Sequence, residues 1–327
     1  MAGEKKTNIF VPILNGIMKK DILTASISII LAMTFWSLTY VWYKMVYEAY
    51  NPITTVLLRL VLSSIILVIL MYPLKKLQKI KMGDFKYFLL VTLFQPFLYF
   101  LCESLGVKLV SSTLAAVIIS TIPLFSPFAT AYFFKEKITK LNFAGIIVSI
   151  IGVAFVIFSK DDNTQLTASP MGILLLFIAV AAGIGYSIVI KKLSGKYNSI
   201  SIVTYHNIIG IFFFLPLFFI FDYKHFVSVG FVKEAVVPLL ELAIFGSSFA
   251  FIFFTVSIKK IGVTKSNAFT NAIPVLTAIF AFFLLGETLT LIKMAGIGLV
   301  ISGLFMSQVR RIPGLVRTKR FFIRPNE

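Results

Sequence analysis

Long apolar runs limit what this chain can fold into more than any other feature of its sequence. Each run approaches the roughly 20 residues that a helix needs to cross a bilayer. Lipid offers backbone groups no hydrogen-bond partners, so each run should be α-helical. The chain is 58% hydrophobic, well above the roughly 45–50% of a soluble domain. The sequence predicts an all-α integral membrane protein with ten transmembrane helices, at residues 22–43, 52–72, 85–106, 111–134, 140–158, 170–190, 199–221, 235–258, 264–285 and 290–308.

The first run could be mistaken for a signal peptide, because Lys19 and Lys20 precede it. It is long enough to span the bilayer, however, and no small-residue cleavage site follows it. We therefore expect a retained first helix.

The distribution of basic residues predicts the orientation. With the N-terminus placed inside, 24 of the 31 lysines and arginines fall in inner connections and tails, six fall outside, and Arg59 alone lies within a span. Such a bias follows the positive-inside rule and predicts cytoplasmic N and C termini in a plasma membrane, here a bacterial inner membrane. The net charge of +18 is thereby assigned to lipid contact rather than to nucleic acid.

The two halves of the chain show an internal repeat at nearly constant offsets. An offset of 151 aligns Ile122-Pro123 with Ile273-Pro274 and Glu136 with Glu287. An offset of 147 aligns earlier positions, namely Lys44 with Lys191, Asn51 with Asn198 and Arg59 with His206. Matches of proline, glutamate and glycine, such as Gly145 with Gly296 and Gly152 with Gly303, are harder to obtain by chance than matches between apolar residues, so they support an internal repeat.

This repeat divides the chain into two units of five helices. The first covers residues 1–158 and the second covers 170–308, with a linker at 159–169 and a basic tail at 309–327. Because five is odd, the second unit starts on the opposite side of the membrane. Inverted repeats of this kind are typical of secondary transporters, which alternate between inward-open and outward-open states.

The repeated segments resemble the drug/metabolite transporter superfamily, in particular its EamA-type ten-helix permeases. The residues that carry the resemblance are Ile122-Pro123-Leu124 to Lys135-Glu136 with Ala144-Gly145 and Gly152; Ile273-Pro274-Val275 to Gly286-Glu287 with Ala295-Gly296 and Gly303; and Trp36, Lys44 and Arg59. One departure is Lys135, where the family often has leucine. The resemblance implies a central cavity from helices 1–4 and 6–9, and small organic substrates that are often exported.

We therefore expect a secondary transporter of small organic metabolites, such as amino acids or related compounds, that exports them by alternating access without ATP. A nucleotide-sugar-like or multidrug carrier of the same superfamily is the alternative. A channel would need rings of charge or carbonyl loops, and an enzyme would need a catalytic motif; the sequence has neither. No Walker motif is present, and the single cysteine, Cys102, excludes a cysteine metal cluster. No cofactor or metal is expected.

Charged residues inside spans are the first candidates for the substrate site. Arg59 lies about seven residues into the second span, where an unpaired arginine costs at least ~2.5 kcal/mol. Glu103 and Glu241 are the carboxylates within spans. Arg59 could hold a substrate carboxylate, or it could form a structural ion pair with Glu103 or Glu241. Both interpretations predict that Arg59 faces the interior.

Other polar and aromatic residues complete the list of cavity candidates. Each could instead serve interhelical packing or hydrogen bonding. They are Trp36, Tyr40, Gln95, His206, Asn207, Asn267 and Asn271.

Certain prolines, glutamates and glycines are predicted to have structural roles. Pro123 and Pro274 should kink equivalent helices and act as gating hinges. Glu136 and Glu287 end spans just before Thr139 and Thr290, so each should fix the turn by accepting N–H groups of the next helix. Small-residue stripes in the fifth and tenth spans should pack scaffold helices, with a homodimer face as the alternative.

Overall fold

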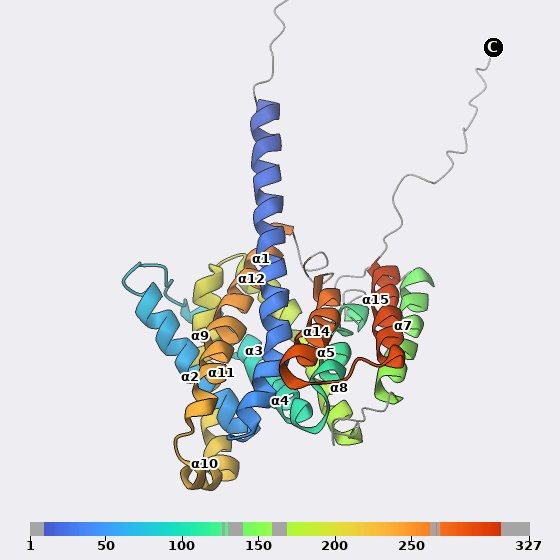
Figure 1. Ribbon diagram of the computed structural model, residues 1–327. Helices are drawn as coiled ribbons and strands as arrows, with labels where there is room; N and C mark the ends of the chain where they lie inside the picture. The colour runs from blue at the N-terminus through green and yellow to red at the C-terminus, as the bar shows by residue number, and fades with distance from the viewer. Residues whose placement is uncertain are drawn as a thin grey trace, which may run out of the picture.

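The computed structural model describes residues 10–125, 128–129, 140–158, 169–261, 266 and 269–308. Side chains are described from Leu23 onward, with a few exceptions that include Asn271. Glu136 and Asn267 therefore lie outside the described residues, as do most of the linker and the basic tail. Every regular element in the described part of the chain is helical, as Figure 1 shows.

The first half forms a bundle around the long helix α1, which begins at Phe10 rather than at the expected residue 22. The third span is composite, because a π-helical segment joins two α-helices. The elements are α1 (Phe10–Tyr47), α2 (Pro52–Met71), η1 (Met82–Asp84), α3 (Phe85–Thr92), η2 (Leu93–Leu98), α4 (Tyr99–Leu109), α5 (Ser112–Ile119) and α7 (Lys140–Phe158).

The second half repeats this order of elements. Its seventh and eighth spans also contain π-helical segments. The elements are α8 (Pro170–Ser194), α9 (Ser199–Leu217), η3 (Phe218–Asp222), α10 (Tyr223–Val229), α11 (Lys233–Glu241), η4 (Leu242–Phe249), α12 (Ala250–Ile261), η5 (Phe269–Ala272), α14 (Ile273–Leu285) and α15 (Leu291–Gln308).

Within the described residues, six helices are long and apolar enough to cross a membrane. Four shorter apolar helices, at Ser112–Phe125, Phe143–Val156, Ile273–Leu285 and Leu291–Gly303, occupy the remaining expected positions. Large apolar side chains such as Phe212, Ile220 and Phe283 remain exposed on the outside of the bundle. In a membrane these side chains contact lipid, so the chain is a multi-pass membrane protein. The full count of ten spans stays a prediction.

The two halves run in opposite directions. The Lys44 ammonium near the end of α1 donates to the carbonyl of Val110 (2.6 Å). A Cβ built on Gly172, near the start of α8, would lie 2.8 Å from the Val110 side chain. The second half thus begins at the end of the bundle where α1 finishes, which is the lower end in Figure 1.

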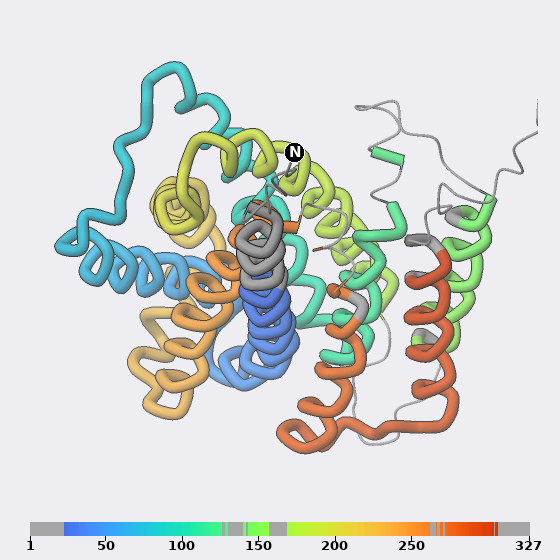
Figure 2. Tube along the Cα trace, turned by 90° about the horizontal axis from the view of Figure 1, so that it is seen from above, coloured from blue at the N-terminus to red at the C-terminus, as the bar shows by residue number. Residues whose placement is uncertain are grey.

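Helices α7 and α15 pack together closely at the edge of the bundle, and Figure 2 shows the pair side by side. A Cβ on Gly152 would lie 2.6 Å from the carbonyl of Gly296, and a Cβ on Gly303 would lie 2.4 Å from that of Gly145. The Ser149 hydroxyl donates to the Val300 carbonyl (2.9 Å). The small residues therefore bring these two helices together within one chain. A homodimer remains an untested expectation.

The fourth and ninth spans are both interrupted. Helix α5 ends at Ile119 and helical structure resumes at residue 122, while η5 leads into α14 at Ile273. Pro123 and Pro274 lie in the first turn of the resumed segments and not in a helix interior as expected. A missing N–H removes no hydrogen bond in a first turn. What the two halves share is therefore a break in the equivalent span, and not a proline kink inside a helix.

A contact between the halves positions helix α2. The side chain of Asn51, the residue before the helix, makes no capping bond. Instead, the N–H and hydroxyl of Thr54 donate to the Asp222 carboxylate of the second half (2.8 and 3.0 Å). Asp222 therefore caps α2 from a distance and fixes the helix that carries Arg59.

Candidate functional site

A partly open cavity lies between the two halves; the space free of atoms within it is about 650 Å³, including space that is open to solvent. Its walls combine aromatic rings with a small set of polar groups, as ligand pockets usually do. It is lined by Trp36, Thr39, Tyr40, Arg59, Gln95, Tyr99, Phe100, Glu103, Ile119, Ile122, Gly183, Tyr186, Ser187, Phe251, Phe254, Thr270 and Ile273.

The lining follows the internal repeat. Fourteen of these seventeen residues form pairs at the two offsets found in the sequence. The cavity therefore sits where equivalent positions of the two halves meet. The pairs are Trp36 with Gly183, Thr39 with Tyr186 and Tyr40 with Ser187 at 147, and Phe100 with Phe251, Glu103 with Phe254, Ile119 with Thr270 and Ile122 with Ile273 at 151.

Arg59 is the buried cation of this cavity, with 1% of its surface exposed. Its Nε donates to the Ser247 hydroxyl (2.6 Å) and its Nη1 donates to the Tyr43 hydroxyl. The guanidinium lies 4.4 Å from the centre of the Phe100 ring. Among the described residues, no carboxylate lies within ion-pair distance of it. Neutral partners thus hold Arg59, and the structural ion pair with Glu103 or Glu241 is not formed.

A polar cluster behind Arg59 fixes its hydroxyl partner. The Asn207 amide donates to the Ser63 hydroxyl (2.8 Å) and to the Ser247 carbonyl (3.2 Å). Ser63 also bonds the hydroxyl of Ser248 (2.7 Å). Asn207 therefore supports the wall and does not line the cavity.

Glu103 supplies a carboxylate to the same cavity. It is 4% exposed and accepts a hydrogen bond from the Tyr40 hydroxyl (3.3 Å). Arg59 and Glu103 thus face one space without an ion pair between them. A ligand that carries both a negative and a positive group would find a partner for each.

Aromatic rings form a further part of the cavity wall. The Trp36 ring lies 5.0 Å from Phe251 and 4.9 Å from Phe254, and the rings of Phe100 and Phe251 are 5.9 Å apart. Such rings favour an apolar group or a cation over their faces.

The cavity gathers five of the residues that the sequence singled out: Trp36, Tyr40, Arg59, Gln95 and Glu103. Gln95 interrupts the third span with a non-helical conformation (φ −154°, ψ 124°). Glu241 is half-buried at the end of α11, away from this lining. His206 lies behind the cavity lining and packs against Phe251. The repeat offsets, applied to the candidates Trp36, Tyr40 and Glu103, would have identified three of the second-half lining residues from sequence, namely Gly183, Ser187 and Phe254.

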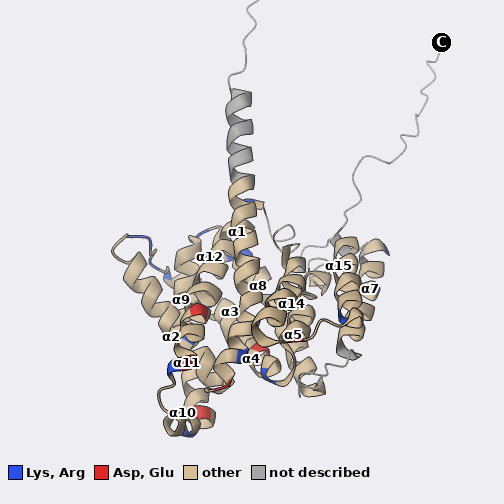
Figure 3. Cartoon of the chain, in the orientation of Figure 1, with Lys and Arg blue, Asp and Glu red and all other residues tan. Residues whose placement is uncertain are grey.

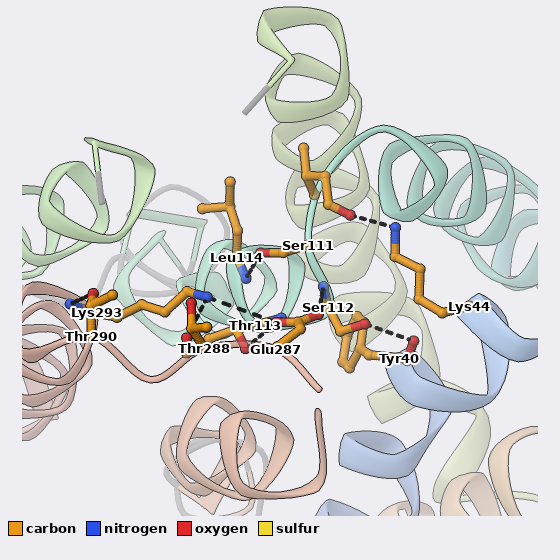
Figure 4. A network of polar contacts seen from close by, with 11 residues as sticks. Tyr40, Lys44, Ser111, Ser112, Thr113, Leu114, Glu287, Thr288, Thr290 and Lys293 are labelled. Carbon is orange, nitrogen blue, oxygen red and sulfur yellow. Dashed lines mark hydrogen bonds and ion pairs between the residues drawn. The ribbon is translucent and has the colours of Figure 1, made fainter. Parts of the chain in front are cut away.

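Glu287 lies at the lower end of the bundle, in the network of Figure 4. The carboxylate accepts the N–H of Ser112 (2.7 Å) and the N–H and hydroxyl of Thr113 (3.3 and 2.7 Å). It therefore caps α5 of the first half, whereas we expected it to cap its own next helix, α15. The Thr290 hydroxyl accepts the N–H of Lys293 at the start of α15 instead (3.2 Å).

This network links the cavity wall to the contact between the two halves. The Ser112 hydroxyl donates to the carbonyl of Tyr40, whose side chain lines the cavity (3.1 Å). Lys293 is buried. Its ammonium lies 4.0 Å from the Glu287 carboxylate and donates to the carbonyl of Thr288 (2.9 Å). The lower ends of α1, α5 and α14 are thereby held together.

Comparison with known proteins agrees with this architecture. The model of the EamA-like transporter family matches residues 23–158 and 170–308. An uncharacterized transporter of Archaeoglobus fulgidus is 29% identical over 88% of this chain and 98% of its own length. The uncharacterized transporter YetK of Bacillus subtilis is 25% identical over 90% of each chain.

A solved crystal structure is similar in fold. It superposes with a TM-score of 0.65 over 86% of this chain and 96% of its own, at 14% sequence identity. At that identity the likeness concerns the fold alone.

Proposed function

Because the chain belongs to the EamA-like transporter family, we propose that it exports zwitterions with an apolar side chain, such as amino acids or related compounds, without ATP. The observation that carries the proposal is the pair of buried, opposite charges on one aromatic cavity, Arg59 and Glu103. Desolvated charges of this kind are costly unless a ligand or a partner satisfies them.

Each part of an amino acid has a matching partner in the cavity. The α-carboxylate binds the Arg59 guanidinium, because arginine is suited to planar carboxylates. The α-ammonium binds Glu103, next to Tyr40 and the ring of Trp36. The side chain lies among Phe100, Phe251 and Phe254, which line the cavity.

Transport by alternating access is part of the proposal. It is supported by the opposite directions of the two halves and by the contact of Glu287 with α5 across them. Exchange of conformations between the halves would open the cavity to each side in turn. Lysine-rich connections such as 72–84 and 191–198 favour the upper end of Figure 3 as the cytoplasmic side of a plasma membrane.

The test is flux in proteoliposomes without ATP, with L-leucine compared with isoamylamine, its decarboxylated counterpart. Leucine uptake should saturate, and Arg59→Gln should lower it at least about tenfold, the effect of losing one charge-assisted hydrogen bond. Arg59→Gln should leave isoamylamine uptake unchanged, whereas Glu103→Gln should lower both. Lys108→Gln, an exposed change near the lower end, is the control. Equal leucine flux in wild type and in a correctly inserted Arg59→Gln protein would refute the proposal.

A multidrug carrier is the second candidate, because the aromatic wall suits apolar cations. Tetraphenylphosphonium in the same vesicles tests it. Uptake of this cation that depends on Glu103 but not on Arg59, without leucine uptake, would favour that function.

A further inference from the structure

His206 is the counterpart of Arg59 in the second half, at the offset of 147. Arg59 lies over the ring of Phe100, and the His206 ring lies 5.7 Å from that of Phe251. Phe100 and Phe251 are themselves counterparts at the offset of 151. The same arrangement of a basic side chain beside a phenylalanine thus occurs twice, once in each half.

The two arrangements differ in one respect. Arg59 lines the cavity, whereas His206 does not. The imidazole ring contacts Tyr186 (6.0 Å) and Phe251, and both of these rings line the cavity. His206 therefore lies directly behind the cavity wall, one ring away from the space that Arg59 faces.

Packing does not account for a histidine at this place. The side chain is 1% exposed, and its Nδ1 has no hydrogen-bond partner in the part of the chain that the structure describes. Tyr43, which accepts a bond from Arg59, has Ile190 as its counterpart, which offers no polar group. A buried polar atom without a partner is unfavourable, and an apolar residue would fill this site at lower cost.

We propose that His206 is a second binding residue for the substrate carboxylate, used in the opposite conformation of the transporter. The proposal rests on the proposed function. When inverted halves exchange conformations, each takes the shape that the other has now. His206 then reaches the cavity surface, where Arg59 is now, while Arg59 withdraws behind Phe100.

The substrate carboxylate thereby keeps a hydrogen-bond donor in both conformations. The donors are unequal, because a guanidinium makes bidentate, charge-assisted bonds and an imidazole offers one N–H at a time. The carboxylate is held more weakly in the conformation that uses His206. Release from that conformation is correspondingly faster.

A labelling experiment tests the position of residue 206 without relying on any substrate. In the full chain with Cys102→Ala, His206→Cys should react with a membrane-impermeant thiol reagent when the second conformation is sampled. Ser187→Cys, at the cavity surface, is the reactive control, and Thr204→Cys, buried on the same helix α9, is the protected control. Protection of residue 206 at the level of residue 204, while residue 187 reacts, would overturn the proposal.

A binding experiment tests the role of the imidazole. The chain has two histidines, so His225→Gln leaves His206 as the single signal of protein carrying ¹³C-labelled histidine. L-leucine should shift that signal and isoamylamine should not. In flux, His206→Gln should lower leucine transport about tenfold and leave isoamylamine transport unchanged. A leucine-to-isoamylamine flux ratio unchanged by His206→Gln, in vesicles where wild type transports leucine, would refute the role.

Failure of the proposed function can be distinguished from failure of the proposed role of His206. If residue 206 is labelled but leucine neither binds nor moves, the proposed substrate is wrong and the exchange of positions stands. If leucine is transported and residue 206 stays protected, the proposed function stands and this inference fails.

Discussion

Replacing Glu287 with glutamine probes the contact that joins the two halves at the lower end of the bundle. The carboxylate accepts three hydrogen bonds from Ser112 and Thr113, and it lies 4.0 Å from buried Lys293. Glutamine keeps one carbonyl acceptor, but its NH₂ group cannot accept the donors that the second oxygen accepts now. At least one charge-assisted bond is lost, at about 1.5–3 kcal/mol.

In the proposed alternating access, opening of the lower end separates Glu287 from α5, so this loss acts on the conformation that is closed there. A loss of about 2 kcal/mol changes the ratio of closed to open molecules by about 30-fold. The assay is labelling of Ser187→Cys, in the Cys102→Ala chain, by an impermeant thiol reagent added on the side of the α1–α2 connection. Glu287→Gln should raise the labelling rate on that side, towards the limit set by the open form.

The matched control is Glu48→Gln, which removes an exposed carboxylate at the same end of the bundle. It should leave the rate unchanged. The reasoning is refuted if Glu287→Gln protein inserts normally and labels at the wild-type rate from both sides. In that case the contact caps α5 without closing the lower end.

Three further substitutions test the packing described above. Gly246→Ala would place a Cβ 2.9 Å from the Thr39 hydroxyl and 3.3 Å from the Arg59 guanidinium. The affinity for leucine, measured in a binding titration, should therefore fall about tenfold, while insertion into the membrane is kept. Gly303→Ala should lower the thermal unfolding temperature, because overpacking costs about 1–3 kcal/mol; Gly298→Ala, which meets nothing within 4 Å in the same helix, should not. Asp222→Ala should destabilise the chain by about 1–2 kcal/mol through loss of the cap on α2, and equal melting of variant and wild type would contradict that role.

Sequence reasoning located the helices well where the bilayer alone sets their length. Helix α7 covers the expected residues 140–158, and α2 and α8 begin at the expected Pro52 and Pro170. The start of α1 at Phe10 was missed, because a helix can continue through polar residues such as Lys19 and Lys20, where hydropathy alone marks the end of the span. The interruptions at residues 120–121 and 269–272 were misread as kinks within continuous helices, since a proline in an apolar run looks alike in both cases.

Side-chain partners were harder to predict than helices. Burial of Arg59 followed from its place in a span, yet its partner Ser247 lies 188 positions away and is a neutral hydroxyl. Glu287 was expected to serve its own turn, whereas its donors lie 174 and 175 positions away in the other half. Local patterns carry no information on which helix ends meet across a bundle. That information arises only when the halves pack.

The differences between equivalent positions explain how a duplicated scaffold can bind an asymmetric molecule. The first half contributes Arg59, Glu103 and Tyr40 to the cavity; the positions equivalent to Glu103 and Tyr40 are Phe254 and Ser187. The ammonium partner therefore exists in one half alone, whereas a carboxylate partner exists in both if His206 takes the place of Arg59. Glu103 and Phe254 both line the cavity, so Glu103 stays at the cavity when the halves exchange conformations, and only the carboxylate partner changes, from Arg59 to the weaker donor His206. Since this change reduces affinity in the second conformation, the asymmetry between the halves favours release there, and a fully symmetric duplication would not.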